Sequence, residues 1–233
     1  MPEISDIALH RVSTAEAVAD ALVGLIVSGT LPAGEPLRES SLAAKLGVSR
    51  NSLREAIRLL ERSRLVQYEI HRGAIVSTPT LEDLDDLTRT RRQLELAAVR
   101  CTPSEAQLEQ LRAAFAQLTR TSEQQRAEAI VAADLALHQA IVDLLGSERM
   151  SSFYRQIGKE LVFYFTVLSY TDEEYAHPKA SIIDRHQGII DAILSGDRDR
   201  AHDLLAGHIE ENHERLAEIL TARIAAAAPA ATR

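Results

Sequence analysis

Residues 42–60 have the sequence LAAKLGVSRNSLREAIRLL, which predicts two helices joined by a tight turn. Leu42 and Leu46 lie one helical turn apart and form the apolar side of the first helix. Gly47 permits the turn, because glycine adopts backbone conformations that other residues avoid. The second helix has an inner apolar face with spacing i, i+4 and i+7, formed by Leu53, Ile57 and Leu60. This pattern is typical of a helix-turn-helix.

The start of the second helix combines a capping signal with positive charge. Asn51 or Ser52 is expected to cap its free amide groups, and Ser52 with Glu55 has the spacing of a capping box. Residues 45–64 contain six basic and two acidic side chains. Four polar residues lie near the start or on the outer face of the helix, where side chains of this motif meet DNA: Arg50, Asn51, Arg54 and Arg58. A solvated charged face on an ordinary helix is the alternative, but the turn, the cap and the following hairpin favour DNA binding.

A hairpin is predicted directly after these helices. Residues 65–70 (LVQYEI) and 74–76 (AIV) are two short β-type runs, joined through His71, Arg72 and Gly73. Gly73 permits the turn, and Arg72 places a charge at the tip, which can lie along a groove of DNA. The prediction for this region is therefore a winged helix-turn-helix.

An additional helix is predicted upstream. It ends at residues 29–34 (GTLPAG), and Ser13 with Glu16 is expected to cap its start. Its apolar stripe consists of Ala15, Val18, Leu22, Leu25 and Ile26. The N-terminal region thus has three helices and a short β-hairpin.

The N-terminal motifs resemble those of the GntR family of bacterial transcription regulators. The likeness covers about a third of the chain: residues 29–34, Leu37-Arg38-Glu39, residues 42–50, Leu53-Arg54-Glu55-Ala56, and Arg72-Gly73. The resemblance implies contacts with operator DNA from Arg38, Arg50, Arg54, Arg72 and Gly73, with Ser49, Asn51 and Ser52 as nearby polar contacts. Many family members have Thr-Pro where this chain has Asn51-Ser52, and this difference affects the base preference at that step.

Length and charge predict two domains of different character. The 233 residues allow a DNA-binding domain at 1–78, a helical domain at 79–224 and a flexible tail at 225–233. Residues 1–78 contain nine basic and nine acidic side chains, so the net charge of −8 comes from residues 79–233, with 17 basic and 25 acidic. A membrane span and a signal peptide are not expected, which predicts a cytoplasmic protein. Cys101 is the single cysteine, so an intrachain disulfide is excluded.

The second domain is expected to be an all-α bundle of about six helices, which makes the fold class mainly α. Glycine is rare there, and breaks fall at capping sequences such as Thr80 with Asp83, residues 102–105, Gly146-Ser147, His177-Pro178 and Gly196-Asp197. The expected helices are 81–100, 103–121, 124–145, 148–170, 178–195 and 198–224.

One group of residues in this bundle suits a metal ion. Asp134 and His138 are four residues apart and project from one helix face, while His186 and His208 lie in the fifth and sixth helices. One carboxylate and three imidazoles suit zinc best, and manganese, nickel or cobalt are also compatible. Four unconnected side chains are the alternative, because the chain has eight histidines.

The bundle also resembles the FCD ligand-sensing domain of the FadR-type subgroup of GntR regulators. The likeness lies in residues 91–95, 134–141, 185–193 and 201–215. It implies that Asp134, His138, His186 and His208 bind a metal at the floor of an effector cavity, and that Arg91 binds the effector, a small organic acid. An exposed arginine on the first helix of the bundle is the alternative for Arg91.

The predicted function is a DNA-binding transcription regulator and not an enzyme. A homodimer would present two winged helices to a two-fold operator, and an acid bound at the metal would change the operator affinity. One alternative is a metal-responsive repressor in which the ion itself is the signal. A metallohydrolase is the other, but the chain has no His-Glu-x-x-His motif to supply a general base.

Overall fold

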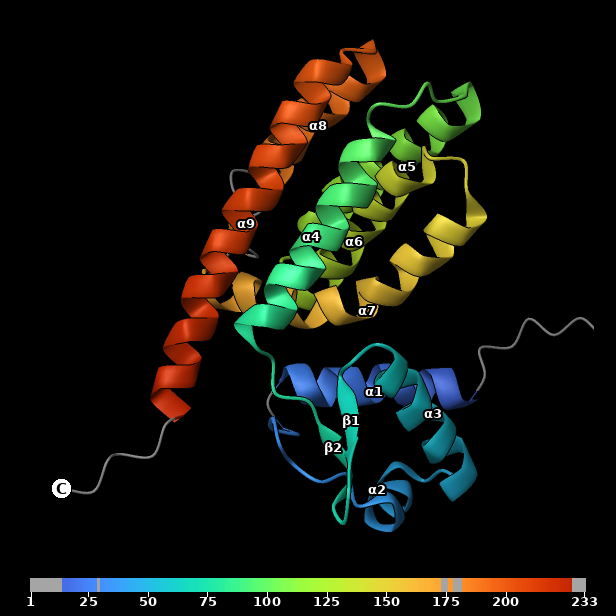
Figure 1. Cartoon of the computed structure of the whole chain (residues 1–233). Coiled ribbons are helices and arrows are strands. Elements are labelled where there is room, and N and C mark those ends of the chain that lie inside the picture. Colours follow the sequence, from blue (N-terminus) through green and yellow to red (C-terminus); the bar gives the residue numbers. More distant parts are fainter. Residues whose placement is uncertain (1–13, 29, 173–175, 178–181, 228–233) are drawn as a thin grey trace, which may run out of the picture. The chain divides into compact units, whose positions relative to one another are not determined.

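The computed structural model describes residues 14–28, 30–172, 176–177 and 182–227 (Figure 1). The chain divides into two compact units, Met1–Thr78 and Pro79–Arg233. Each unit is described by itself.

The first unit is a winged helix-turn-helix, as predicted. Its elements are α1 (Thr14–Val27), α2 (Glu39–Leu46), α3 (Arg50–Arg62), β1 (Val66–Glu69) and β2 (Gly73–Val76). The inner face of α3 is fully buried at Leu53, Ile57 and Leu60, and α1 packs against α3. The two strands are antiparallel, and Val66 lies opposite Val76. Pro36 forms an additional bridge with Ile75, so the segment before α2 extends this small sheet.

The turn between α2 and α3 is as predicted at Gly47, but the N-cap of α3 is a different residue from the one predicted. Gly47 has a φ of 65° and ends α2 in the left-handed region, as its type predicts. Ser49 is the N-cap of α3, because its Oγ accepts a 3.0 Å hydrogen bond from the backbone N–H of Ser52. The expectation that Asn51 or Ser52 caps the helix is therefore wrong. The chain enters helical geometry at Arg50, directly after the extended Ser49, and both predicted caps lie inside the first turn. Ser13, the predicted cap of α1, lies outside the described residues.

The second unit contains six helices within the described residues. They are α4 (Leu81–Ala98), α5 (Glu105–Ser122), α6 (Ala127–Asp143), α7 (Glu148–Thr171), α8 (Asp184–Ser195) and α9 (Arg198–Ala227). Thr80 caps α4 through the N–H of Asp83, as predicted, and Ser104 with Gln107 forms a capping box at α5. Most predicted boundaries differ from the structure by one to three residues: α6, for example, begins at Ala127 and not at 124, and α9 continues to Ala227, past 224. The largest difference is at α8, which begins at Asp184 and not at 178. Residues 178–181 and 228–233 lie outside the described residues.

Two apolar clusters form the core of the second unit, and α6 contributes to both. Ile130, Leu137 and Ile141 pack in a cluster with α5, α8 and the first half of α9. Val131, Leu135 and Val142 pack in another with α7 and the second half of α9. Because its residues belong to both clusters, α6 lies between them and is the central helix of the bundle. None of the described helices is both long and apolar enough to cross a membrane.

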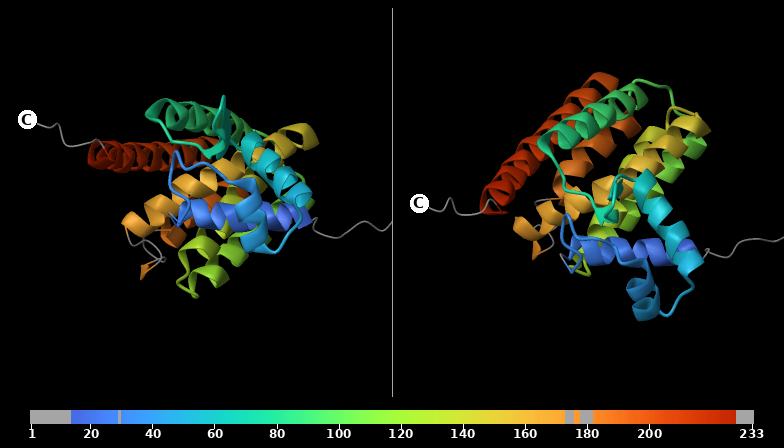
Figure 2. Two further views of the ribbon diagram at one scale, coloured as in Figure 1. Left: turned by 90° about the horizontal axis from the view of Figure 1, so that it is seen from below. Right: turned by 60° about the horizontal axis from the view of Figure 1, so that its bottom comes forward.

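The boundary between the two clusters is polar. The helices α4 and α9 run side by side (Figures 1 and 2), and each contributes to one cluster near one end and to the other cluster near the other end. Between these apolar segments each helix has buried polar residues, and so does α6. They are Arg91 and Glu95 on α4, Asp134 and His138 on α6, and His208 and Asn212 on α9. The fold therefore gathers polar side chains from separate helices at one buried place.

Candidate functional site

The predicted DNA-contacting arginines lie exposed around α3 and the hairpin. Arg50 is the first residue of α3, and Arg54 and Arg38 are also exposed. Arg54 Nε donates to Glu39 Oε2 at 2.7 Å. This hydrogen bond and the Glu39 charge raise the pKa of the Arg54 guanidinium, so Arg54 keeps its positive charge.

Arg72 of the hairpin turn is held in a similar way. Its Nη1 donates to Glu69 Oε2 at 2.6 Å, and its Nη2 donates to the carbonyl oxygen of Gly34 at 3.0 Å. Gly73 has a φ of 75°, which agrees with its predicted role in the turn. The tip of the wing is thus oriented by hydrogen bonds within the unit.

Tyr68 of β1 lies near the arginines of α3 and was not among the residues predicted from the sequence to contact DNA. Its side chain is half exposed on β1. Burial and the charges of Glu39 and Glu61 raise the pKa of its phenol, while Arg58 and Arg54 act in the opposite direction, which places Tyr68 within electrostatic range of the arginines of α3. Its position on the solvent side of a predicted strand was the available signal.

Three of the four predicted metal ligands converge in the second unit. His138, His186 and His208 are all buried, and one nitrogen from each lies within 4.8 Å of the others. Asp134 is outside that group of three but adjacent to it, because its Oδ1 lies 3.0 Å from His186 Nε2. The structure thus brings together residues from α6, α8 and α9.

The hydrogen bonds of two histidines direct a nitrogen of each toward the same point. His138 Nδ1 lies 2.7 Å from Glu95 Oε2, and His186 Nδ1 lies 2.8 Å from the carbonyl oxygen of Ile182. Nδ1 of each ring faces an acceptor, and the two Nε2 atoms lie 3.2 Å from each other. His186 Nε2 also lies 3.0 Å from Asp134 Oδ1, so this point suits a shared cation, either a proton on His186 or a metal ion. Two nitrogens bound to one zinc ion at about 2.0–2.1 Å would be separated by about 2.9–3.4 Å.

One further buried atom at this place, His208 Nδ1, has no hydrogen-bond partner among the described residues. Within the same part of the chain, Asp134 Oδ1 has only its contact with His186 Nε2 at 3.0 Å. His208 Nε2 lies 3.2 Å from the Asn212 amide, which leaves Nδ1 as its second nitrogen. Unsatisfied buried polar atoms are costly, and a metal ion is one way to satisfy them. The donor set therefore fits a divalent ion such as zinc.

The electrostatic state of these groups also suits a cation. Burial raises the pKa of Asp134, but the neighbouring His186 outweighs this effect and lowers it to about 2, so the carboxylate is charged at neutral pH. Burial lowers the pKa of His208 well below its usual value, and the nearby His186 and His138 lower it further. A neutral His208 offers the lone pair that metal binding requires.

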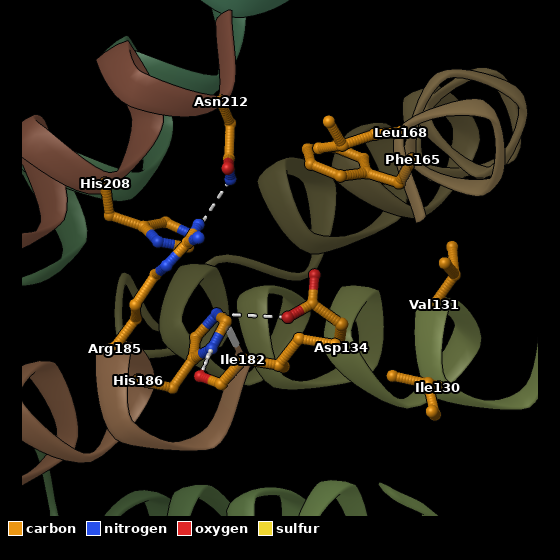
Figure 3. A pocket seen from close by; sticks show the side chains of 10 residues that line it. All are labelled: Ile130, Val131, Asp134, Phe165, Leu168, Ile182, Arg185, His186, His208 and Asn212. Atoms are coloured by element: carbon orange, nitrogen blue, oxygen red, sulfur yellow. Dashed lines mark hydrogen bonds and ion pairs between the residues drawn. The ribbon is translucent and has the colours of Figure 1, made fainter. Parts of the chain in front are cut away.

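A pocket adjoins the histidines (Figure 3). Figure 3 shows Asp134, His186 and His208 together, with Phe165 and Leu168 of α7 opposite His208. The lining residues are Ile130, Val131, Asp134, Phe165, Leu168, Ile182, Arg185, His186, His208 and Asn212. The lining thus combines charged and polar groups, the carboxylate of Asp134 included, with apolar side chains. The sequence analysis did not select Arg185 or Asn212.

Arg91 is buried, which excludes the alternative of an exposed arginine on the first helix of the bundle. Its side chain is only 3% exposed, its Nε donates to Glu95 Oε1 at 2.8 Å, and its guanidinium lies 5.0 Å from the ring centre of Phe165. Arg91 does not line the pocket itself. Burial lowers the pKa of Arg91, but the Glu95 charge outweighs it and the net shift is upward.

Two stretches of the chain match known families. Residues 14–76 match the family described as bacterial regulatory proteins, gntR family. Residues 86–211 match the FCD domain.

Proteins that are similar to this chain over most of their length are also described as transcriptional regulators. The uncharacterized HTH-type transcriptional regulator YdhC of Bacillus subtilis (strain 168) is 26% identical over 200 residues, which cover 84% of this chain and 88% of that protein. The probable D-xylose utilization operon transcriptional repressor of Paenarthrobacter nicotinovorans is 29% identical over 203 residues, covering 86% and 88%. A solved structure of a GntR transcriptional regulator from Rhodococcus sp. RHA1 has a TM-score of 0.71 and 29% identity, covering 87% of this chain and 96% of that one. These relatives are described as regulators of transcription and not as enzymes.

Proposed function

This chain belongs to the GntR family of bacterial transcriptional regulators and carries an FCD domain, and on that premise we propose that it senses a small carboxylate at a metal ion. Regulators of this family bind operator DNA. The finer proposal is that a homodimer binds a two-fold operator through Arg38, Arg50, Arg54 and the wing residues Arg72 and Gly73. Ser49, Asn51 and Ser52 would add polar contacts beside them.

The observation that carries the metal proposal is the convergence of three buried imidazoles. Asp134, His138, His186 and His208 would hold the ion, with zinc as the first candidate. A divalent ion bound by four protein ligands would offer further coordination positions that a carboxylate can fill. The carboxylates of Asp134 and Glu95 and the guanidinium of Arg91 sum to one negative charge beside the three imidazoles, which favours a cation there.

The effector proposal depends on the pocket next to the histidines. Arg185 is the one arginine among the described residues that line it, and an anionic effector would pair with its guanidinium. Arg91 remains the predicted effector residue. Its guanidinium lies 5.0 Å from the ring centre of Phe165, which lines the pocket, and its Nη2 is buried without a hydrogen-bond partner among the described residues. Sugar acids, hydroxy acids and dicarboxylates are the classes we propose to test. The relative whose name concerns D-xylose utilization is described as a repressor, and we propose repression for this chain too.

The metal proposal is tested by elemental analysis of the purified full-length chain. The unaltered chain should retain about one divalent ion per chain after dialysis, and His208→Ala should lose it. His202→Ala is the matched control, because His202 lies on the same helix with its side chain partly exposed, bonded to Asp203. Metal retention by His208→Ala equal to that of His202→Ala would contradict the assignment.

The effector proposal is tested by a thermal-shift screen of carboxylates on zinc-loaded and metal-free protein. A true effector should raise the Tm only of the zinc-loaded form, because it binds the folded state through the metal. Operator binding measured with zinc alone, and then with the selected acid, separates an acid sensor from a repressor that responds to the ion itself.

A further inference from the structure

The polar side chain most enclosed beside the histidines is Glu95 of α4. It is 0% exposed, and its two oxygens have three partners from three helices. Oε2 lies 2.7 Å from His138 Nδ1 of α6. Oε1 accepts from Arg91 Nε at 2.8 Å and from the Tyr154 hydroxyl of α7 at 2.5 Å. None of these contacts is an exposed ion pair that solvent could replace.

Burying such a network costs free energy, because charged and polar groups lose their contact with water. Arg91 and Glu95 form an ion pair whose side chains are only 3% and 0% exposed. Well-packed apolar side chains in the place of a buried ion pair often give equal or higher stability. A use for the carboxylate other than stability is therefore expected.

The geometry shows what that use is. A carboxylate that accepts from Nδ1–H of a histidine sets the tautomer, fixes the ring orientation and increases the basicity of the opposite nitrogen. His138 Nε2 is that opposite nitrogen, and it faces His186 Nε2 at 3.2 Å. The other two histidines have neutral partners on their second nitrogens, the Ile182 carbonyl and the Asn212 amide. His138 is thus the only one of the three whose second nitrogen faces a carboxylate in the part of the chain that the structure describes.

We propose that Glu95 is the positioning residue of the metal site: it holds His138 with Nδ1 protonated and Nε2 directed at the ion, while Tyr154 and Arg91 hold Glu95. The proposal rests on the metal site put forward above. It adds an outer carboxylate and a phenol that the four predicted ligands do not include.

Zinc affinity of variants tests the proposal. Glu95→Gln keeps the shape but removes the charge, and the double variant Arg91→Met, Glu95→Gln also removes the unpaired guanidinium that the single change leaves. Both should bind zinc about 10–100-fold more weakly than the unaltered chain in a chelator competition. Tyr154→Phe should have a smaller effect in the same direction, and Tyr164→Phe on the same helix is the control that should leave the zinc affinity unchanged.

A spectroscopic measurement separates positioning from a merely structural role. The visible absorption of the Co²⁺-loaded chain reports the ligand field, and the double variant should shift these bands while its far-UV circular dichroism remains that of the unaltered chain. Glu95 variants with unchanged zinc affinity and unchanged Co²⁺ bands would overturn the inference. If the unaltered chain bound neither ion, the metal site and this inference would both be lost.

One measurement needs no variant at Glu95 and therefore does not depend on whether such variants fold. In the zinc-loaded chain with ¹⁵N-labelled histidine, NMR assigns the protonated nitrogen of each ring, and loss of a signal in His138→Gln identifies His138. We expect the proton on Nδ1. A proton on Nε2 of His138 would overturn the proposal.

Discussion

Arg54 combines two properties at the scale of a single residue. It is exposed on the outer face of α3, and Glu39 of α2 accepts its Nε–H at 2.7 Å. An exposed ion pair of this kind contributes little to folding stability. Its effect is to orient the guanidinium through Nε.

Arg54→Ala is therefore expected to weaken DNA binding without unfolding the chain. If Arg54 reads a base, affinity for the specific operator should fall by about 1–3 kcal/mol, with a smaller loss on unrelated DNA. If it contacts only phosphate, affinity should fall evenly across sequences and the salt dependence should become less steep. Fluorescence anisotropy at several salt concentrations measures both.

Arg89→Ala supplies the control for charge, because Arg89 is an exposed arginine of α4 in the other unit. Equal operator affinities for Arg54→Ala and Arg89→Ala would show that Arg54 takes no part in binding.

At the scale of elements, two glycines of the first unit differ in backbone conformation. Gly47 ends α2 with a φ of 65°, whereas Gly24 lies inside α1, where an added Cβ would meet nothing within 4 Å. The same substitution should thus have opposite effects at the two positions.

Gly47→Ala should destabilise the first unit by about 1–2 kcal/mol, because an L-residue is strained in the left-handed region. Gly24→Ala should stabilise it by about 0.5–1 kcal/mol, since alanine loses less backbone entropy in a helix. Urea denaturation of both variants beside the unaltered chain measures the difference. A stabilising Gly47→Ala would mean that the turn is not left-handed.

An ion pair that depends on pH joins Asp172, at the C-terminal end of α7, to Arg215 in the interior of α9. Hydrogen bonds from Arg215 lower the pKa of Asp172, with Arg215 Nε and Nη2 donating to the carboxylate. A lowered pKa means that the contribution to stability is present above the unfolded pKa, about 3.9, and is lost as the pH falls through the folded value.

Asp172→Asn should consequently lower the Tm slightly at pH 7 and have no effect at a pH below the folded pKa. The effect is small because solvent reaches both partners. Thermal unfolding followed by circular dichroism from pH 2 to pH 8 provides the comparison. A difference in Tm that persisted undiminished in acid would show that the ion pair is not its cause.

At the scale of the whole molecule, the two units have separate cores, and the candidate metal ligands belong to only one. The four ligands lie in the unit Pro79–Arg233, and residues 77–80 connect it to the wing. A metal that binds the folded second unit should therefore stabilise that unit by mass action, by about 2.7 kcal/mol at a free concentration of 100 Kd.

Calorimetry with and without zinc should show this as an upward shift of one unfolding transition. Two variants assign the transitions to the units. Gly47→Ala should lower the transition temperature of the first unit. Leu137→Ala, at a fully buried position, should lower the transition temperature of the second unit, because it reduces the free energy of unfolding by about 2–5 kcal/mol. An equal zinc-induced shift in His208→Ala would refute the prediction, because that variant lacks a ligand.

The sequence by itself determined the winged helix-turn-helix and the six-helix composition of the second unit. The physical reason is that these signals are local: apolar spacing, Gly47 and the capping residues Thr80 and Ser104 act within a few residues of the chain. The local cap of α3 was placed wrongly, at Asn51 or Ser52, because several capping residues in succession differ only in where the chain enters the helix.

Only the tertiary structure decided the surroundings of the histidines. Glu95 and His138 are 43 residues apart, His138 and His186 are 48 apart, and Glu95 and Tyr154 are 59 apart. No spacing rule predicts which ring nitrogen faces which acceptor across such separations, and Arg91 is a surface or a core residue according to how α4 packs against α6 and α7. These contacts are set when two apolar clusters close around α6 and leave the polar side chains of α4, α6, α8 and α9 enclosed between them.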